Sequence, residues 1–80
     1  MDRLFILQDI FRQVFDDDEL VITRETNRGQ VAGWDSVAQV KLVLFLEEEF
    51  GIRFSEDEVS SLQTVGDFLT SIETHKDRGA

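Results

Sequence analysis

The sequence predicts an all-α fold, a small four-helix bundle of three main helices and one short helix, with a long loop between the first two. Apolar residues recur at helical spacing in three stretches, and capping residues bound these stretches. The one segment with strand-like alternation, residues 20–23, has no second strand to pair with. These observations favour helices throughout.

The length of 80 residues fits a single domain, residues 1–80, with a modest core. The chain has no cysteine, which excludes disulfides and thiolate metal sites and is compatible with a cytoplasmic setting. No stretch approaches about 18 consecutive apolar residues, and no basic region followed by an apolar run opens the chain. We therefore expect a cytoplasmic monomer with no membrane span.

The formal net charge of −9 bears on the partners of the protein. Nucleic acid is not expected among them, because its phosphates would be repelled. Partners with basic docking surfaces are favoured, because opposite fields speed encounter and set orientation. The alternative is that the acidity serves only to keep a small protein soluble.

Residues 3–15 are predicted to form an amphipathic helix, with Asp2 as a possible cap. Its apolar positions are Leu4, Leu7, Ile10, Phe11 and Val14. The acidic run 16–19 should end it in a solvated turn. A calcium loop starting at Asp16 is rejected, because its sixth and twelfth positions are Val21 and Asn27 where glycine and glutamate are needed.

Residues 20–34 form the longest irregular stretch, rich in turn-forming residues. Leu20 and Ile22 are expected to anchor it to the core. Trp34 is expected to pack the loop onto the core, with a direct role in binding as the alternative. A loop of about 15 residues is unusual in a compact domain unless it is functional or pinned.

The stretch Gly33–Gly51 predicts one helix of about four turns. Either Asp35 or Ser36 should cap its first turn, and Gly51 should close it in a left-handed conformation. This places the Ser36 hydroxyl at a helix N-terminus, at the mouth of the loop.

This helix has more apolar surface than one core needs. One arc, expected to face the core, holds Leu42, Val43, Leu46 and Phe50. A second arc of Val37, Val40 and Leu44 runs down from Ser36 and would be free for a partner. Periodicity alone also allows both arcs to be buried.

After this helix, Ile52 and Phe54 should return to the core. Ser55–Glu58 reads as a capping box for a short helix, about Glu56–Ser61. Thr64 should cap the last helix, with Asp67 in its first turn. The buried stripe of that helix is Val65, Phe68, Leu69 and Ile72. Residues 75–80 have no apolar anchor and are expected to fray as a disordered tail.

Enzymatic sites find little support. The only histidine, His75, falls in the expected tail, so neither a Ser-His pair nor a histidine metal site can form inside the fold. The carboxylates lie on helix surfaces, and no glycine-rich phosphate loop is present. We therefore expect a protein that is not an enzyme.

Three motifs together resemble the acyl carrier proteins. Asp35-Ser36-Val37 is similar to the Asp-Ser-Leu signature at the head of that family's second helix. The run Leu46–Ile52 is similar to its Leu-Glu-Glu-Glu-Phe segment, and Thr64–Phe68 to the opening of its last helix. Length, charge, long first loop and helix order agree over nearly the whole chain.

The resemblance implies that Ser36, with Asp35 beside it, is the attachment point for phosphopantetheine. A separate phosphopantetheinyl transferase would add the arm, and acyl-loading and acyl-transfer enzymes would bind through basic docking surfaces. The resemblance places the partner-binding residues on the second helix: Val37, Val40, Lys41, Leu44, Glu47 and Glu48.

The departures from the family pattern concern docking. Val37 stands where leucine is common, Ala38 where aspartate is common, and Lys41 where glutamate is common. Lys41 changes the local charge by two units and opposes binding to basic partners of a general fatty-acid carrier. We expect a specialised carrier serving a dedicated lipid, polyketide or cell-envelope pathway, and Trp34 is similar to a feature of discrete carriers in such pathways.

Two alternatives belong to other functional classes. One is an unmodified acidic adaptor that binds partners through the face formed by Val37, Val40 and Leu44. The other is an acidic mimic of nucleic acid, which the apolar second arc disfavours. Only the carrier requires the Ser36 hydroxyl.

Overall fold

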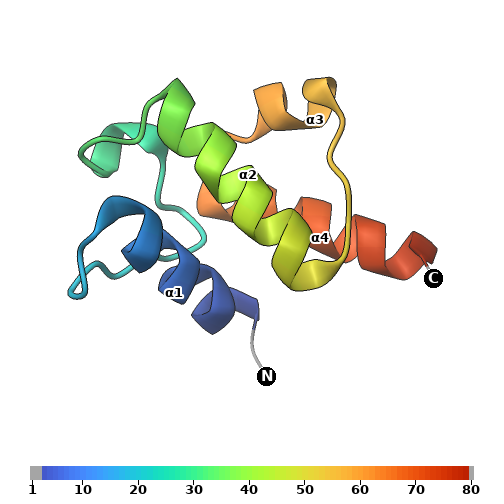
Figure 1. The fold of residues 1–80 in the computed structure, drawn as a ribbon, viewed down its shortest axis with the longest axis horizontal. Helices are drawn as coiled ribbons and strands as arrows, with labels where there is room; N and C mark the ends of the chain where they lie inside the picture. The colour runs from blue at the N-terminus through green and yellow to red at the C-terminus, as the bar shows by residue number, and fades with distance from the viewer. Residues whose placement is uncertain (1–2, 80) are drawn as a thin grey trace.

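The computed structural model describes residues 3–79 and confirms the all-helical architecture (Figure 1). Its helices are α1 (Arg3–Phe15), α2 (Ser36–Phe50), α3 (Glu56–Ser61) and α4 (Val65–Gly79). In Figure 1, α2 crosses the centre of the molecule, and α1, α3 and α4 surround it. Within the described residues, no helix is long and apolar enough to cross a membrane. The possible cap Asp2 lies outside this part.

The core is one cluster of side chains that includes residues of α1, α2, α4 and the long loop, and Val59 of α3 packs against it. At its centre four aromatic rings meet: Phe11, Phe15, Trp34 and Phe68. The rings of Phe11 and Trp34 pack edge to face with centroids 5.2 Å apart, and Phe11 packs likewise on Phe68 at 6.0 Å. Trp34 is 6% exposed, so it packs the loop onto the core as predicted.

The loop between α1 and α2 is held to α1 and to α4 by hydrogen bonds, which explains why so long a segment is ordered. Arg12 Nε donates to the Leu20 carbonyl at 2.8 Å, and Ile22, 3% exposed, anchors the chain as expected. Further along, the amides of the first turn of α4 donate to loop carbonyls: Val65 to Thr26 at 2.9 Å and Gly66 to Arg24 at 2.8 Å.

Two details of this loop were not predicted. Residues Arg28–Gln30 form a single 3₁₀ turn, η1, capped by Asn27, whose side chain accepts from Gly29 N at 2.9 Å. Asn27 also forms an isolated antiparallel bridge with Thr64. A Cβ atom at Gly66 would lie 3.0 Å from the Arg24 carbonyl oxygen, so the bare glycine allows the loop to approach α4 this closely.

Three predicted helix caps, at Gly51, Ser55 and Thr64, are confirmed. Gly51 has φ of 64° and its amide donates to the Glu47 carbonyl, the left-handed cap that ends α2. Ser55 and Glu58 form the reciprocal capping box of α3. Asp67 N donates to Thr64 Oγ1 at 3.1 Å and Thr64 N donates to Asp67 Oδ2 at 3.0 Å, which fixes the start of α4.

The C-terminal segment differs from the expectation of a tail that frays from His75. Helix α4 continues to Gly79. His75 Nε2 lies 2.7 Å from Glu58 Oε2 in α3, and its ring packs edge to face on Phe54 with centroids 5.3 Å apart. This anchor could not be predicted from the sequence, because Glu58 and Phe54 both lie far from His75 along the chain. Ala80 lies outside the described residues.

The same pair yields a prediction about pH. The pKa of Glu58 is lowered from its ordinary 4.5, first by the Ser55 amide, which donates to Oε1, and also by His75, while burial works against both. A carboxyl group whose pKa is lower in the folded than in the unfolded state stabilises the fold at pH values above its unfolded pKa. This stabilisation is lost as the pH falls through the folded pKa. Urea unfolding should therefore show Glu58→Gln less stable than wild type at about pH 6, with the difference shrinking towards about pH 3.

Glutamine keeps an oxygen that can accept from the Ser55 amide, so this variant removes the charge and preserves the cap. Glu56→Gln, at an exposed position of the same short helix, is the matched control and should show a smaller pH-dependent difference. An equal pH dependence of stability in the two variants would contradict the conclusion that the Glu58 charge stabilises the fold.

Candidate functional site

Ser36 is the first residue of α2, and its side chain is exposed. The cap of this helix is Asp35: its Oδ1 accepts from Ala38 N at 2.9 Å, and its backbone carbonyl accepts from Gln39 N at 2.9 Å. In the described part of the chain, no group hydrogen-bonds to the Ser36 hydroxyl. Asp35 therefore performs the capping and leaves the Ser36 hydroxyl free for chemistry.

The surroundings of this hydroxyl favour an anion. The amides of Ser36 and Val37 have no acceptor among residues 3–79, and they point out of the positive end of a four-turn helix. No acidic residue occupies the first turn of α2. A phosphodiester on the Ser36 oxygen would find donors and a favourable dipole here, so the residues present fit a phosphopantetheine arm.

The second apolar arc of α2 lies exposed, as one of the two sequence interpretations required. Val37, Val40 and Leu44 are 64%, 52% and 58% exposed. The first arc, including Leu42 and Leu46 at 0%, is buried. Helix α2 therefore presents apolar side chains to solvent below Ser36.

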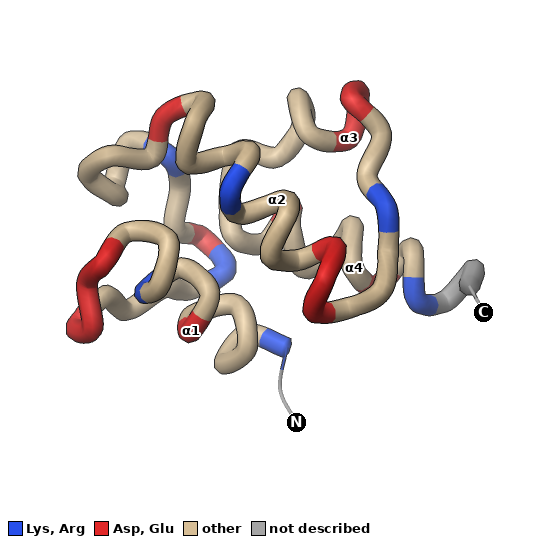
Figure 2. The backbone as a smooth tube through the Cα atoms, in the orientation of Figure 1, with Lys and Arg blue, Asp and Glu red and all other residues tan. Residues whose placement is uncertain are grey.

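The charged residues predicted to contact partners differ in how free they are. Lys41 and Glu48 are exposed on α2. Glu47 is half-buried, and its Oε2 accepts from Phe54 N at 2.9 Å, so one of its carboxylate oxygens holds the segment after α2. Figure 2 shows acidic residues at the C-terminal end of α2 and a basic position nearer its start.

Grooves border the exposed face of α2. A groove of about 450 Å³ lies between α2 and α3. It is lined mainly by apolar side chains: Val40, Val43, Leu44, Phe54 and Val59, with Glu56 and Ser60 beside them. This groove opens next to the arc that runs down from Ser36.

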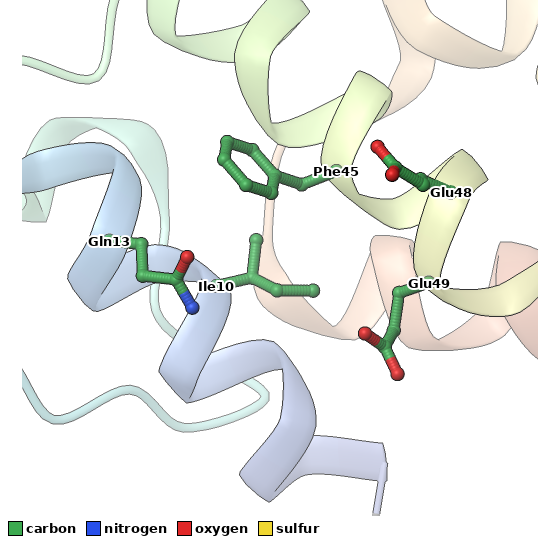
Figure 3. A pocket seen from close by; sticks show the side chains of 5 residues that line it. All are labelled: Ile10, Gln13, Phe45, Glu48 and Glu49. Carbon is green, nitrogen blue, oxygen red and sulfur yellow. The ribbon is translucent and has the colours of Figure 1, made fainter.

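Another groove, of about 400 Å³, lies between α1 and α2 (Figure 3). The Phe45 ring extends from α2 towards α1, near Ile10 and Gln13, with the carboxylates of Glu48 and Glu49 beside it. Phe45 is 40% exposed and was not singled out from the sequence. On the helical wheel Phe45 lies between the charged residues Lys41 and Glu49, and this spacing could have predicted from the sequence that its ring is at the surface.

The sequence interpretation also missed Gln39, which is 5% exposed and the one buried polar or charged side chain among those the structure describes. Its Oε1 accepts from Trp34 Nε1 at 2.7 Å. Its Nε2 donates to the carbonyls of Val59 and Leu62, each at 3.1 Å. Helical spacing places Gln39 on the same arc as Leu42 and Leu46, so its burial was predictable although its partners were not.

Comparison with known proteins agrees with this geometry. The family model "Phosphopantetheine attachment site" matches residues 6–72. The acyl carrier protein of Lactobacillus acidophilus is 34% identical over 70 residues, which cover 88% of each chain.

Two solved structures share the fold. The solution NMR structure of holo acyl carrier protein from Geobacter metallireducens has a TM-score of 0.87 and 40% identity, covering 98% of this chain and 90% of that one. A candidate acyl carrier protein from Mycobacterium tuberculosis has a TM-score of 0.83 and 25% identity, covering 91% of this chain and 97% of that one. The similarity therefore extends over most of the chain in both sequence and structure.

Proposed function

This chain belongs to the acyl carrier proteins, which carry acyl groups on covalently attached phosphopantetheine, and we propose that Ser36 is the residue that holds the arm. The observation that carries the proposal is the division of roles at the start of α2. Asp35 caps the helix, so the exposed Ser36 hydroxyl has no structural hydrogen bond to give up. When attached, phosphopantetheine supplies a thiol, which the cysteine-free chain lacks, to hold acyl groups as thioesters.

The roles of the neighbouring residues follow from their positions. Asp35 fixes the first turn through Ala38 N, and this holds the Ser36 oxygen at the helix end. The free amides of Ser36 and Val37 would stabilise the negative charge of a phosphodiester on that oxygen. We propose that the exposed Val37, Val40 and Leu44, with Lys41, Glu47 and Glu48, contact the transferase and the acyl-loading and acyl-transfer enzymes.

The attachment is tested by incubating the protein with coenzyme A and a broad-specificity phosphopantetheinyl transferase. Intact mass spectrometry should show one arm added per chain, and fragmentation should place it on Ser36. An unmodified protein in the presence of a transferase that modifies a known carrier would contradict the proposal, as would an arm located on another residue.

We further propose that this is a specialised carrier with dedicated partners in a lipid, polyketide or cell-envelope pathway, working in the cytoplasm. Support comes from Lys41, which is exposed on the docking helix where the family pattern has an acid. A cation at this position repels the basic surface of a partner adapted to the common pattern.

This leads to a prediction for Lys41→Glu. The variant should bind an enzyme of the general fatty-acid pathway more tightly than the wild type, by up to about 1 kcal/mol at low salt, or roughly fivefold in Kd. The gain should shrink as salt rises, because the charges are exposed. Titration by calorimetry or surface plasmon resonance measures it, with Lys76→Glu on α4 as the control that should change little. Unchanged or weaker binding would show the charge argument to be wrong.

A further inference from the structure

Gln39 is an unusual residue for its place in the fold. It lies on the buried arc of α2, where an apolar side chain would pack without any need for hydrogen bonds. A buried amide is costly unless it is bonded, and Gln39 makes three hydrogen bonds of 2.7, 3.1 and 3.1 Å. Such a network fixes the relative positions of the segments it joins.

On one side, this network holds the segment that presents Ser36. Gly33 turns the chain with φ of 88°, and Asp35 N donates back to the Gly33 carbonyl at 2.9 Å. Trp34, between them, donates its indole hydrogen to Gln39. The backbone leading into Ser36 is therefore fixed by Trp34 from within and by the Asp35 cap at the helix end.

On the other side, the same amide holds α3. Its Nε2 donates to Val59, in the last turn of that helix, and to Leu62, the residue that follows it. Six residues are too few for a helix to be stable alone, so the position of α3 depends on such contacts. Val59 also lines the groove between α2 and α3, so a group that fills the groove presses on a residue bonded to Gln39.

We infer that Gln39 is a positioning residue that couples the filling of the α2–α3 groove to the segment presenting Ser36. The inference rests on the proposed attachment at Ser36. We expect an acyl chain carried on the arm to enter this groove and press on Val59, which displaces the end of α3. This displacement strains the bonds from Gln39 Nε2 to the carbonyls of Val59 and Leu62. The amide then shifts, and its bond to the Trp34 indole lengthens. The carrier would thus present the root of its arm differently when loaded and when empty, as a coupling between two sites requires.

The test uses the single indole N–H of the chain as the reporter, because Trp34 is its one tryptophan. A transferase loads the full-length protein from coenzyme A, giving a bare arm, or from decanoyl-coenzyme A, giving an arm with an apolar chain. NMR then measures the chemical shift of the indole proton and its exchange with solvent. In the wild type, exchange should be at least about threefold faster with the decanoyl arm, and the signal should move.

Gln39→Met keeps the length of the side chain and removes all three hydrogen bonds, so the two arms should give the same indole exchange rate. Gln63→Met, at an exposed glutamine beside α3, is the matched control and should keep the wild-type difference. Val59→Ala retains the carbonyl that Gln39 contacts and removes the side chain in the groove. It should shrink the difference, and it serves as the second variant should Gln39→Met not fold.

The outcomes separate this inference from the attachment itself. A wild type that takes no arm overturns the Ser36 proposal and the coupling with it. A loaded wild type whose indole signal is the same with either arm overturns the coupling alone. A Gln39→Met variant that keeps the wild-type difference in indole exchange also overturns the coupling, because the effect of the acyl chain would then reach Trp34 without Gln39.

Discussion

Ser36→Ala should abolish addition of the phosphopantetheine arm while leaving the fold intact. The hydroxyl oxygen is the atom that would form the phosphodiester, and alanine has none. The helix cap is made by Asp35 Oδ1 on Ala38 N, so the free energy of unfolding should change by less than about 0.5 kcal/mol. Intact mass spectrometry after incubation with coenzyme A and a transferase measures the first effect, and urea unfolding measures the second.

Ser60→Ala is the matched control, because Ser60 is also exposed, lies on α3 and lines the adjacent groove. This variant should take the arm as the wild type does. An arm that persists on Ser36→Ala would refute the site. A large loss of stability in Ser36→Ala would instead show that the hydroxyl has a structural role that its surroundings do not reveal. An unmodified adaptor would bind its partners equally well with alanine at position 36.

The second large effect is expected at Phe11, which is fully buried and touches Phe15, Trp34 and Phe68. Phe11→Ala should lower the free energy of unfolding by about 3–5 kcal/mol, through lost burial and the cavity left behind. A domain of this length has roughly 4–12 kcal/mol in total, so much of the protein should be unfolded at modest urea concentrations. Trp34 fluorescence in urea titrations measures the change.

Phe5→Ala, in the same helix, removes an identical side chain from a position that is 65% exposed. It should cost less than about 0.5 kcal/mol. Comparable losses for the two variants would contradict the central place given to the Phe11–Trp34 contact.

The fold could be predicted from the sequence because its signals are local. The apolar spacing of residues 3–15 and 36–50 and the caps at Gly51, Ser55 and Thr64 each lie within a few residues of the helix they define. The exposure of Ser36 follows from the same local rules. That Asp35 rather than Ser36 is the cap required the structure, because both side chains are suited to the role.

Most of the features that could not be predicted join distant segments. The sequence does not show that His75 reaches Glu58, or that Gln39 bonds to Val59 and Leu62. Each contact depends on how the helices cross, and periodicity does not determine this crossing. The course of residues 20–34 is a further example, because two carbonyls of this loop accept hydrogen bonds from the distant amides of Val65 and Gly66.

Gly66 packs closely against the Arg24 carbonyl and donates its amide hydrogen to it, so the loop and the start of α4 are expected to move together. A load applied to the end of the chain, such as the tether of a fused protein, would be transmitted along α4 into the segment that leads to Ser36. Attachments to the carboxyl end should therefore be joined through a flexible spacer if the serine is to keep its native presentation.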